Sequence, residues 1–142
     1  MQHVRMFFEG SEGSKRKMRK MSKALIVSRD ANICEKINNV LAGLGIETLV
    51  THSATKALKF LAEDEAISLV VTDRIFKEKE GEWLINNMKK HENYKDIPVI
   101  AMAEFTGLKE IANILRAGAR AFVPKPLFGQ FFREYVLRYI RN

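Results

Sequence analysis

Short apolar runs alternate with segments of helical periodicity along most of the chain. Five runs are typical of strands: residues 24–28, 46–52, 67–72, 97–103 and 121–124. The run at 24–28 reads as a strand buried on both faces of a sheet, and the run at 67–72 is the clearest buried strand. Between and after them, apolar residues recur at three- and four-residue spacing, which predicts helices around 33–44, 57–61, 83–88, 111–115 and 127–140. This alternation predicts a doubly wound α/β domain, with a five-stranded parallel sheet covered by helices on both faces.

The first 22 residues lack this periodicity. They contain a Glu-Gly-Ser repeat typical of a flexible linker and a basic run, Lys15–Lys20. We therefore predict a basic arm over 1–22 and one folded domain over 23–142. Three interpretations of the arm stay open: a tether for phosphate or an acidic partner, a disordered extension, or a start codon placed too early, because Met18 and Met21 could also start the chain.

Composition places the chain among ordinary globular proteins. At 142 residues it fits one domain, and 46% hydrophobic with 29% charged residues is enough to form a core. The single cysteine, Cys34, excludes an internal disulfide and is expected to be a core residue. The sequence shows no membrane-spanning run and no secretory leader, so we expect a cytoplasmic protein without membrane contact.

The net charge of +7 is concentrated at the N-terminus. Residues 1–23 carry seven basic and two acidic side chains, a net +5, which leaves +2 for the remainder. A nearly neutral domain argues against nucleic-acid binding by the domain itself.

The carboxyl ends of parallel strands are where ligands and chemistry gather in such folds. Asp73 directly follows the clearest buried strand, and Lys125 ends the last strand before Pro126. Both side chains are therefore expected to face one crevice at this edge of the sheet.

Several short motifs flank these two residues in a single register over residues 24–140. They are LIV at 25–27, LVVTD at 69–73, Glu80-Gly81, IPVI at 97–100, AGA at 117–119 and Lys125-Pro126. Together they resemble the receiver domains of bacterial two-component response regulators, the CheY-like family with a flavodoxin-like fold.

The resemblance implies a phosphorylation switch. A histidine kinase would transfer a phosphoryl group to Asp73, and Lys125 would contact the phosphoryl oxygens. Mg²⁺ would be held by Asp73, by an acidic pair after the first strand and by the carbonyl of Ile75. The family's two switch residues, a hydroxyl and an aromatic, correspond to Ala103 and Phe122.

The sequence departs from this pattern where the metal should bind. The acidic pair is replaced by Ser28 and Arg29, which with Glu80 form a degenerate acidic pocket. Arg29, Lys125 and Asp73 give this crevice a local charge of +1, so no metal or other cofactor is expected, and Arg29 is predicted to pair with Asp73 instead. Asp30 is predicted to cap the next helix.

The switch is also altered. Ala103 cannot hydrogen-bond a phosphate, and Phe122 has no hydroxyl with which to report its state. We therefore predict that ordinary Mg²⁺-dependent phosphorylation is lost, and that Asp73 is a structural carboxylate held by Arg29 and Lys125.

Other chemistries find no support in the sequence. His3, His52 and His91 are far apart and expected away from the crevice, which disfavours a histidine metal site. No Gly-x-Gly-x-x-Gly or Gly-x-Ser-x-Gly motif is present, so nucleotide binding and hydrolase chemistry are not expected. The chain is not expected to be an enzyme.

Two main hypotheses remain. The first is a stand-alone, atypical receiver that docks a protein partner, a histidine kinase or a downstream signalling protein, or a second copy. Its surface would be residues 107–140, with the basic residues Lys109, Arg116, Arg120, Arg133 and Arg138. The second is a working phosphoacceptor modified on Asp73 by a histidine kinase. A nucleic-acid tether through the arm is a third, less favoured possibility.

Overall fold

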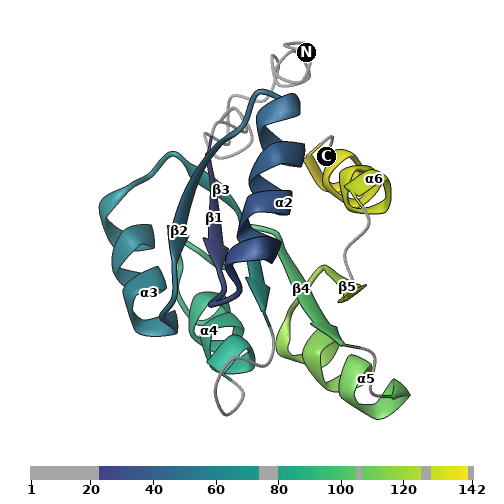
Figure 1. The fold of residues 1–142 in the computed structure, drawn as a ribbon. Helices are drawn as coiled ribbons and strands as arrows, with labels where there is room; N and C mark the ends of the chain where they lie inside the picture. Colours follow the sequence, from purple (N-terminus) through teal and green to yellow (C-terminus); the bar gives the residue numbers. More distant parts are fainter. Residues whose placement is uncertain (1–22, 74–79, 105–106, 126–128, 141–142) are drawn as a thin grey trace, which may run out of the picture.

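The computed structural model describes residues 23–73, 80–104, 107–125 and 129–140 (Figure 1). The predicted arm and Ile75, whose carbonyl was an expected metal ligand, lie outside the described residues. Strands and helices alternate in the order β1 Lys23–Val27, α2 Ala31–Gly43, β2 Glu47–Thr51, α3 Ala54–Glu63, β3 Ile67–Asp73, α4 Glu80–Lys89, β4 Val99–Glu104, α5 Leu108–Ala117, β5 Ala121–Lys125 and α6 Gly129–Ile140.

All five strands belong to one parallel sheet in the order β2-β1-β3-β4-β5. The strand order reverses between β1 and β3: β2 is added on one side of β1, and β3, β4 and β5 on the other. In flavodoxin-like folds, ligands bind at this switch point. The fold class predicted from the apolar periodicity is therefore confirmed.

Two apolar layers hold the helices on the sheet. Helices α2 and α6 cover one face, and α3, α4 and α5 cover the other (Figure 1). Phe132 of α6 is fully buried in the first layer, and Leu84, Ile85 and Met88 of α4 are fully buried in the second. Strand residues face both layers, which explains why the strands read as continuous apolar runs.

A capping side chain begins helix α2, and a glycine ends helix α5. The Asp30 carboxylate accepts hydrogen bonds from the backbone N–H groups of Asn32 and Ile33, so the predicted cap of α2 is confirmed. Helix α5 ends at Gly118, whose φ of 126° favours glycine. A Cβ at Gly118 would also lie 2.8 Å from Cγ of Lys89, so the stem of this lysine excludes a larger residue.

Some element ends differ from the predicted ones. The fourth strand begins at Val99 rather than 97, because Pro98 precedes it and has no N–H for the ladder. The last helix is described from Gly129, and residues 126–128 lie outside the described part. Among the described residues, no helix is long and apolar enough to cross a membrane.

Candidate functional site

Asp73 is the last residue of β3, and its side chain is buried at the carboxyl edge of the sheet. The residue is 3% exposed. Strand β3 lies between β1 and β4, and Asp73 is paired with Met102 in the register of the ladder. Asp73 is thus held in a ladder with β4 at the end of the central strand rather than in a loop.

Two side chains donate to one oxygen of this carboxylate. Lys125 Nζ lies 2.9 Å from Asp73 Oδ2, and Ser28 Oγ donates to the same oxygen at 3.2 Å. The other oxygen, Oδ1, is buried and has no hydrogen-bond partner among the described residues. The predicted meeting of Asp73 and Lys125 is therefore found, and half of the carboxylate is left available for a further interaction.

The backbone of the β1–α2 loop fixes the position of Ser28. Its N–H donates to Thr51 O at 3.1 Å, and its hydroxyl accepts from Asp30 N at 3.0 Å. Nδ1 of His52 lies 2.7 Å from Ser28 O, so Nδ1 carries the hydrogen because a carbonyl can only accept. These contacts aim the fully buried hydroxyl at Asp73.

Arg29 does not take the place predicted for it. Its Nε donates to His52 O at 3.2 Å, while the hydrogen bonds to Asp73 come from Ser28 and Lys125. The predicted pairing of Arg29 with Asp73 is not among the hydrogen bonds and ion pairs found between the described residues. The reason is that the β1–α2 loop turns Arg29 toward the neighbouring β2–α3 loop, where a backbone carbonyl accepts the guanidinium.

His52 is also closer to the crevice than expected. It follows β2 directly, and its ring and carbonyl contact Ser28 and Arg29 respectively. The prediction that this histidine lies away from the site is wrong. Strand β2 ends at the same edge of the sheet as β3, so His52 lies at the edge that carries Asp73. Its distance along the sequence concealed that position.

Of the two positions of the predicted switch, Ala103 lies in the strand next to that of Asp73, and Phe122 lies one strand further away. Ala103 is buried in β4, one residue beyond the partner of Asp73, and the next residue of that strand pairs with Lys125. Phe122 is half-buried in β5 and packs on the apolar layer under α3, α4 and α5. Glu80 begins α4, and its side chain lies outside the described residues.

The described residues do not fit Mg²⁺. The ion prefers near-octahedral oxygen ligands with one or two carboxylates. The buried Oδ1 of Asp73 could serve as one ligand, but Oδ2 is already neutralised by Lys125 and the former acidic positions hold a hydroxyl and a guanidinium. No group of three metal-ligating side chains occurs among the residues the structure describes.

Cys34 packs beneath this loop. Its Sγ lies 3.8 Å from Ser28 O, and burial raises the pKa of the thiol. A buried neutral thiol is a poor nucleophile, so the predicted core role of Cys34 fits its surroundings.

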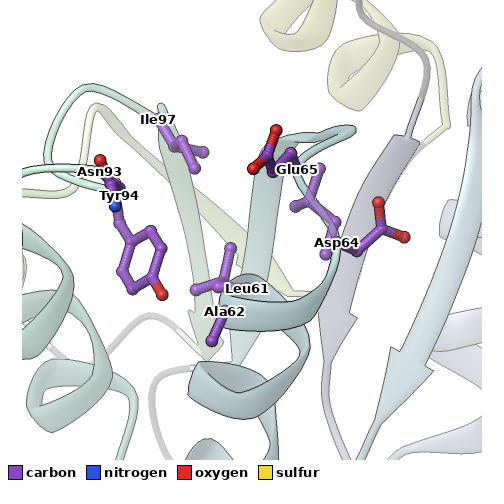
Figure 2. A pocket seen from close by; sticks show the side chains of 8 residues that line it. Leu61, Ala62, Asp64, Glu65, Asn93, Tyr94 and Ile97 are labelled. Carbon is purple, nitrogen blue, oxygen red and sulfur yellow. The ribbon is translucent and has the colours of Figure 1, made fainter.

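A second polar cluster lies at the opposite, amino edge of the sheet. Lys23, the first residue of β1, forms an ion pair of 2.6 Å with Asp64 after α3. A pocket of about 240 Å³ opens beside this pair. Figure 2 shows Asn93, Tyr94 and Ile97 on one side of the pocket and Asp64 and Glu65 on the other. No sequence signal identified this pocket, because its walls come from two stretches, 61–67 and 93–97, that are far apart in sequence.

The surface predicted for docking is formed by α5, β5 and α6. The predicted basic residues on it are all exposed: Lys109, Arg116, Arg120, Arg133 and Arg138. Two leucines of α5 are exposed beside them, Leu108 at 79% and Leu115 at 42%. Exposed leucines within a cationic surface are a frequent feature of protein-binding sites.

The sequence was compared with known protein families and proteins. The family model described as "Response regulator receiver domain" matches residues 24–136. A 76.5 kDa protein of Thiocystis violacea is 30% identical over 105 residues, which cover 72% of this chain and 15% of that protein. The chemotaxis protein CheY1 of Helicobacter pylori is 26% identical, with 79% of this chain and 91% of that protein covered.

The fold comparison agrees with the sequence comparison. The crystal structure of a response regulator from Thermotoga maritima superposes with a TM-score of 0.77 and 22% identity, covering 86% of this chain and 99% of that one. The chain therefore spans nearly the whole of some relatives and only a small part of the Thiocystis protein.

Proposed function

The chain belongs to the response regulator receiver domain family of two-component signalling, and from that premise we propose that it acts through protein–protein contacts without Mg²⁺-dependent phosphorylation of Asp73. In this proposal the chain is a binding module rather than an enzyme. Its partner is a histidine kinase or a downstream signalling protein.

The observation that carries the proposal is the replacement of the acidic pair. An attacking carboxylate and a phosphoryl group repel each other, and a divalent ion normally offsets that repulsion. Here Ser28 donates a hydrogen bond to Asp73, and Arg29 contacts the β2–α3 loop. The described site therefore contains one carboxylate, already paired with Lys125, in place of the three acidic side chains that the family resemblance implies for the metal site.

The loss of the switch hydroxyl supports the same proposal. A phosphoryl group on Asp73 would lie near the buried methyl of Ala103, which cannot donate a hydrogen bond. Phosphorylation would then lack the contact that shifts the fold between two states. A module that no longer switches can still present a fixed binding surface.

The surface of α5, β5 and α6 is the docking surface in this proposal. Leu108 and Leu115 supply exposed apolar contacts, and the surrounding basic side chains favour an acidic partner surface. Lys125 at the end of β5 contacts Asp73, but the exposed leucines and basic side chains of this surface lie on or beside α5 and α6, so a partner can bind them without a phosphorylation cycle.

The alternative of a working phosphoacceptor is supported by one observation. Oδ1 of Asp73 is buried and without a hydrogen-bond partner among the described residues, while Lys125 is already placed 2.9 Å from Oδ2. An attacking oxygen and a cation for the phosphoryl group are thus both present. This alternative requires an unusual source of charge neutralisation.

One assay separates the two. The full chain is incubated with Mg²⁺ and acetyl phosphate, or with beryllofluoride, and its intact mass and peptide masses are measured. We expect no adduct on Asp73, and the same result for Asp73→Asn, which is the background control. A stoichiometric adduct on Asp73, absent in Asp73→Asn, would establish the phosphoacceptor alternative instead.

A further inference from the structure

The pocket at the amino edge of the sheet has walls of two kinds. Its apolar floor is formed by Leu61, Ile67 and Ile97, which are all buried. Its rim carries the carboxylates of Asp64 and Glu65, and Figure 2 shows both on the same side. No basic side chain is among the described residues that line it. A side chain with an alkyl stem and a cationic tip, lysine or arginine, matches such a site.

The pocket has a rigid wall on the side of α4. Nζ of Lys89 donates to Lys95 O at 2.9 Å and to Ile97 O at 3.5 Å, which ties the segment before β4 to the end of α4. Tyr94 stacks on His91 with ring centroids 4.0 Å apart. The pocket is therefore preformed rather than dependent on a mobile loop for its shape.

The described chain begins next to this pocket. Lys23 is paired with Ile67 in the β1–β3 ladder, and Ile67 belongs to the pocket floor. Adjacent strands lie about 4.8 Å apart, so the chain enters the sheet one strand away from the pocket. Lys23 also contacts the rim directly, since its Nζ lies 2.6 Å from Asp64 Oδ2.

The residues that precede Lys23 have the required chemistry. Arg19 and Lys20 lie four and three positions earlier, and a basic run extends back to Lys15. An extended residue spans at most about 3.5 Å, so Arg19 can reach about 14 Å from Lys23. Both side chains can therefore reach Glu65 without any change in the described fold.

We propose that residues 15–22 of the chain dock intramolecularly on this pocket, with the stem of Arg19 or Lys20 on the apolar floor and its cationic tip at Glu65. A covalently attached segment competes well against free partners because its effective concentration is high. The arm is then held at the edge of the sheet opposite Asp73. Its basic charges are directed to the rim of the pocket rather than to nucleic acid.

Limited trypsin digestion of the full chain tests this docking. Cleavage after Arg19 and Lys20 is timed by mass spectrometry in the original chain and in Glu65→Gln. We expect cleavage about fivefold faster in Glu65→Gln, the change that corresponds to loss of one exposed ion pair. Glu63→Gln is the matched control, because Glu63 is exposed on α3 and does not line the pocket, and it should leave the rate unchanged.

A spectroscopic measurement complements the digestion. In the full chain, Arg19→Gln with Lys20→Gln should shift the NMR signals of Tyr94 and Leu61 while leaving those of Asp73 and Ser28 in place. Equal cleavage rates in the original chain, Glu65→Gln and Glu63→Gln would overturn the proposal. So would unchanged NMR signals of Tyr94 in the variant that lacks Arg19 and Lys20. Protection that increases with protein concentration would also overturn it, because the arm would then dock on a second copy.

Discussion

Two lysine–carboxylate pairs mark the two edges of the sheet. Lys125 and Asp73 lie 2.9 Å apart at the carboxyl edge, and Lys23 and Asp64 lie 2.6 Å apart at the amino edge. The pairs have the same chemistry but different surroundings. The side chains of the first pair are 17% and 5% exposed, and those of the second are 24% and 25% exposed.

The hydrogen bonds of the two carboxylates differ as well. Both oxygens of Asp64 are used, one by Lys23 and the other by the backbone N–H of Ala66. Asp73 uses one oxygen twice and leaves the buried Oδ1 without a partner in the described structure. A fully hydrogen-bonded, quarter-exposed pair is typical of a structural contact, whereas a buried and incompletely satisfied carboxylate is typical of a functional site.

The largest expected effect comes from Lys125→Met. Removal of this lysine leaves the buried carboxylate of Asp73 without its counter-charge, and we expect the free energy of unfolding to fall by about 3 kcal/mol. Urea unfolding at neutral pH measures the loss. Lys23→Met is the matched variant at the other edge and should cost far less, because water can still solvate the partly exposed Asp64.

A double variant separates charge from packing. Lys125→Met combined with Asp73→Asn has no unpaired buried charge and should recover most of the stability lost in Lys125→Met alone. Equal losses for Lys125→Met and Lys23→Met would remove the distinction between the two edges.

A smaller effect is expected for the serine at each edge. Ser28→Ala removes a donor to the buried Asp73 carboxylate and should cost about 1.5 kcal/mol, because hydrogen bonds to charged groups are the stronger ones. Ser68→Ala removes a hydroxyl that donates to the neutral Lys23 carbonyl at 3.4 Å and should cost about 0.5 kcal/mol. Thermal unfolding compares the two variants. A larger loss of stability in Ser68→Ala than in Ser28→Ala would contradict the conclusion that the buried Asp73 carboxylate depends more strongly on its hydrogen bonds.

The smallest effect concerns pH and the exposed pair. The hydrogen bond from Lys23 lowers the pKa of Asp64, and the hydrogen bond to Asp64 raises the pKa of Lys23. The contribution of Asp64 to the free energy of unfolding is therefore fully present above its unfolded pKa of about 3.9. It is lost as the pH falls through the lower pKa of the folded state. The contribution of Lys23 to the free energy of unfolding is fully present below its unfolded pKa of about 10.4. It is lost as the pH rises through the higher pKa of the folded state.

Asp64→Asn tests this pH dependence. Its stability deficit should be small, should be present at neutral pH, and should disappear in acid as Asp64 of the original chain becomes protonated. Glu63→Gln, one residue earlier and exposed, is the control and should show no such pattern. A deficit that persists unchanged in strong acid would show that packing rather than charge is involved.

The sequence was sufficient to predict the fold because the central strands β1, β3 and β4 are almost entirely buried and therefore read as apolar runs, while the partly exposed edge strands β2 and β5 still alternate with helices. The edge at which Asp73 and Lys125 meet also followed, since parallel strands bring their carboxyl ends together. Asp30 was identifiable as a cap because its partners are two and three residues away.

Contacts set by loops could not be predicted in the same way. Arg29 has a long flexible side chain, and its direction depends on where the carbonyl of His52 lies, 23 residues away in sequence. The pair of Lys23 and Asp64 joins residues 41 positions apart with no motif around them. The pocket beside it arises from packing of α3, the start of β3 and the segment before β4.

The most direct test of the carboxyl edge is a calorimetric Mg²⁺ titration of the full chain beside Ser28→Asp/Arg29→Asp. The double substitution changes the local charge by −3 and restores two carboxylates in the loop whose Ser28 contacts the Asp73 carboxylate. We expect no saturable binding by the original chain at millimolar Mg²⁺ and clear binding by the double variant. Saturable binding by the original chain that Asp73→Asn abolishes would contradict the loss of the metal site.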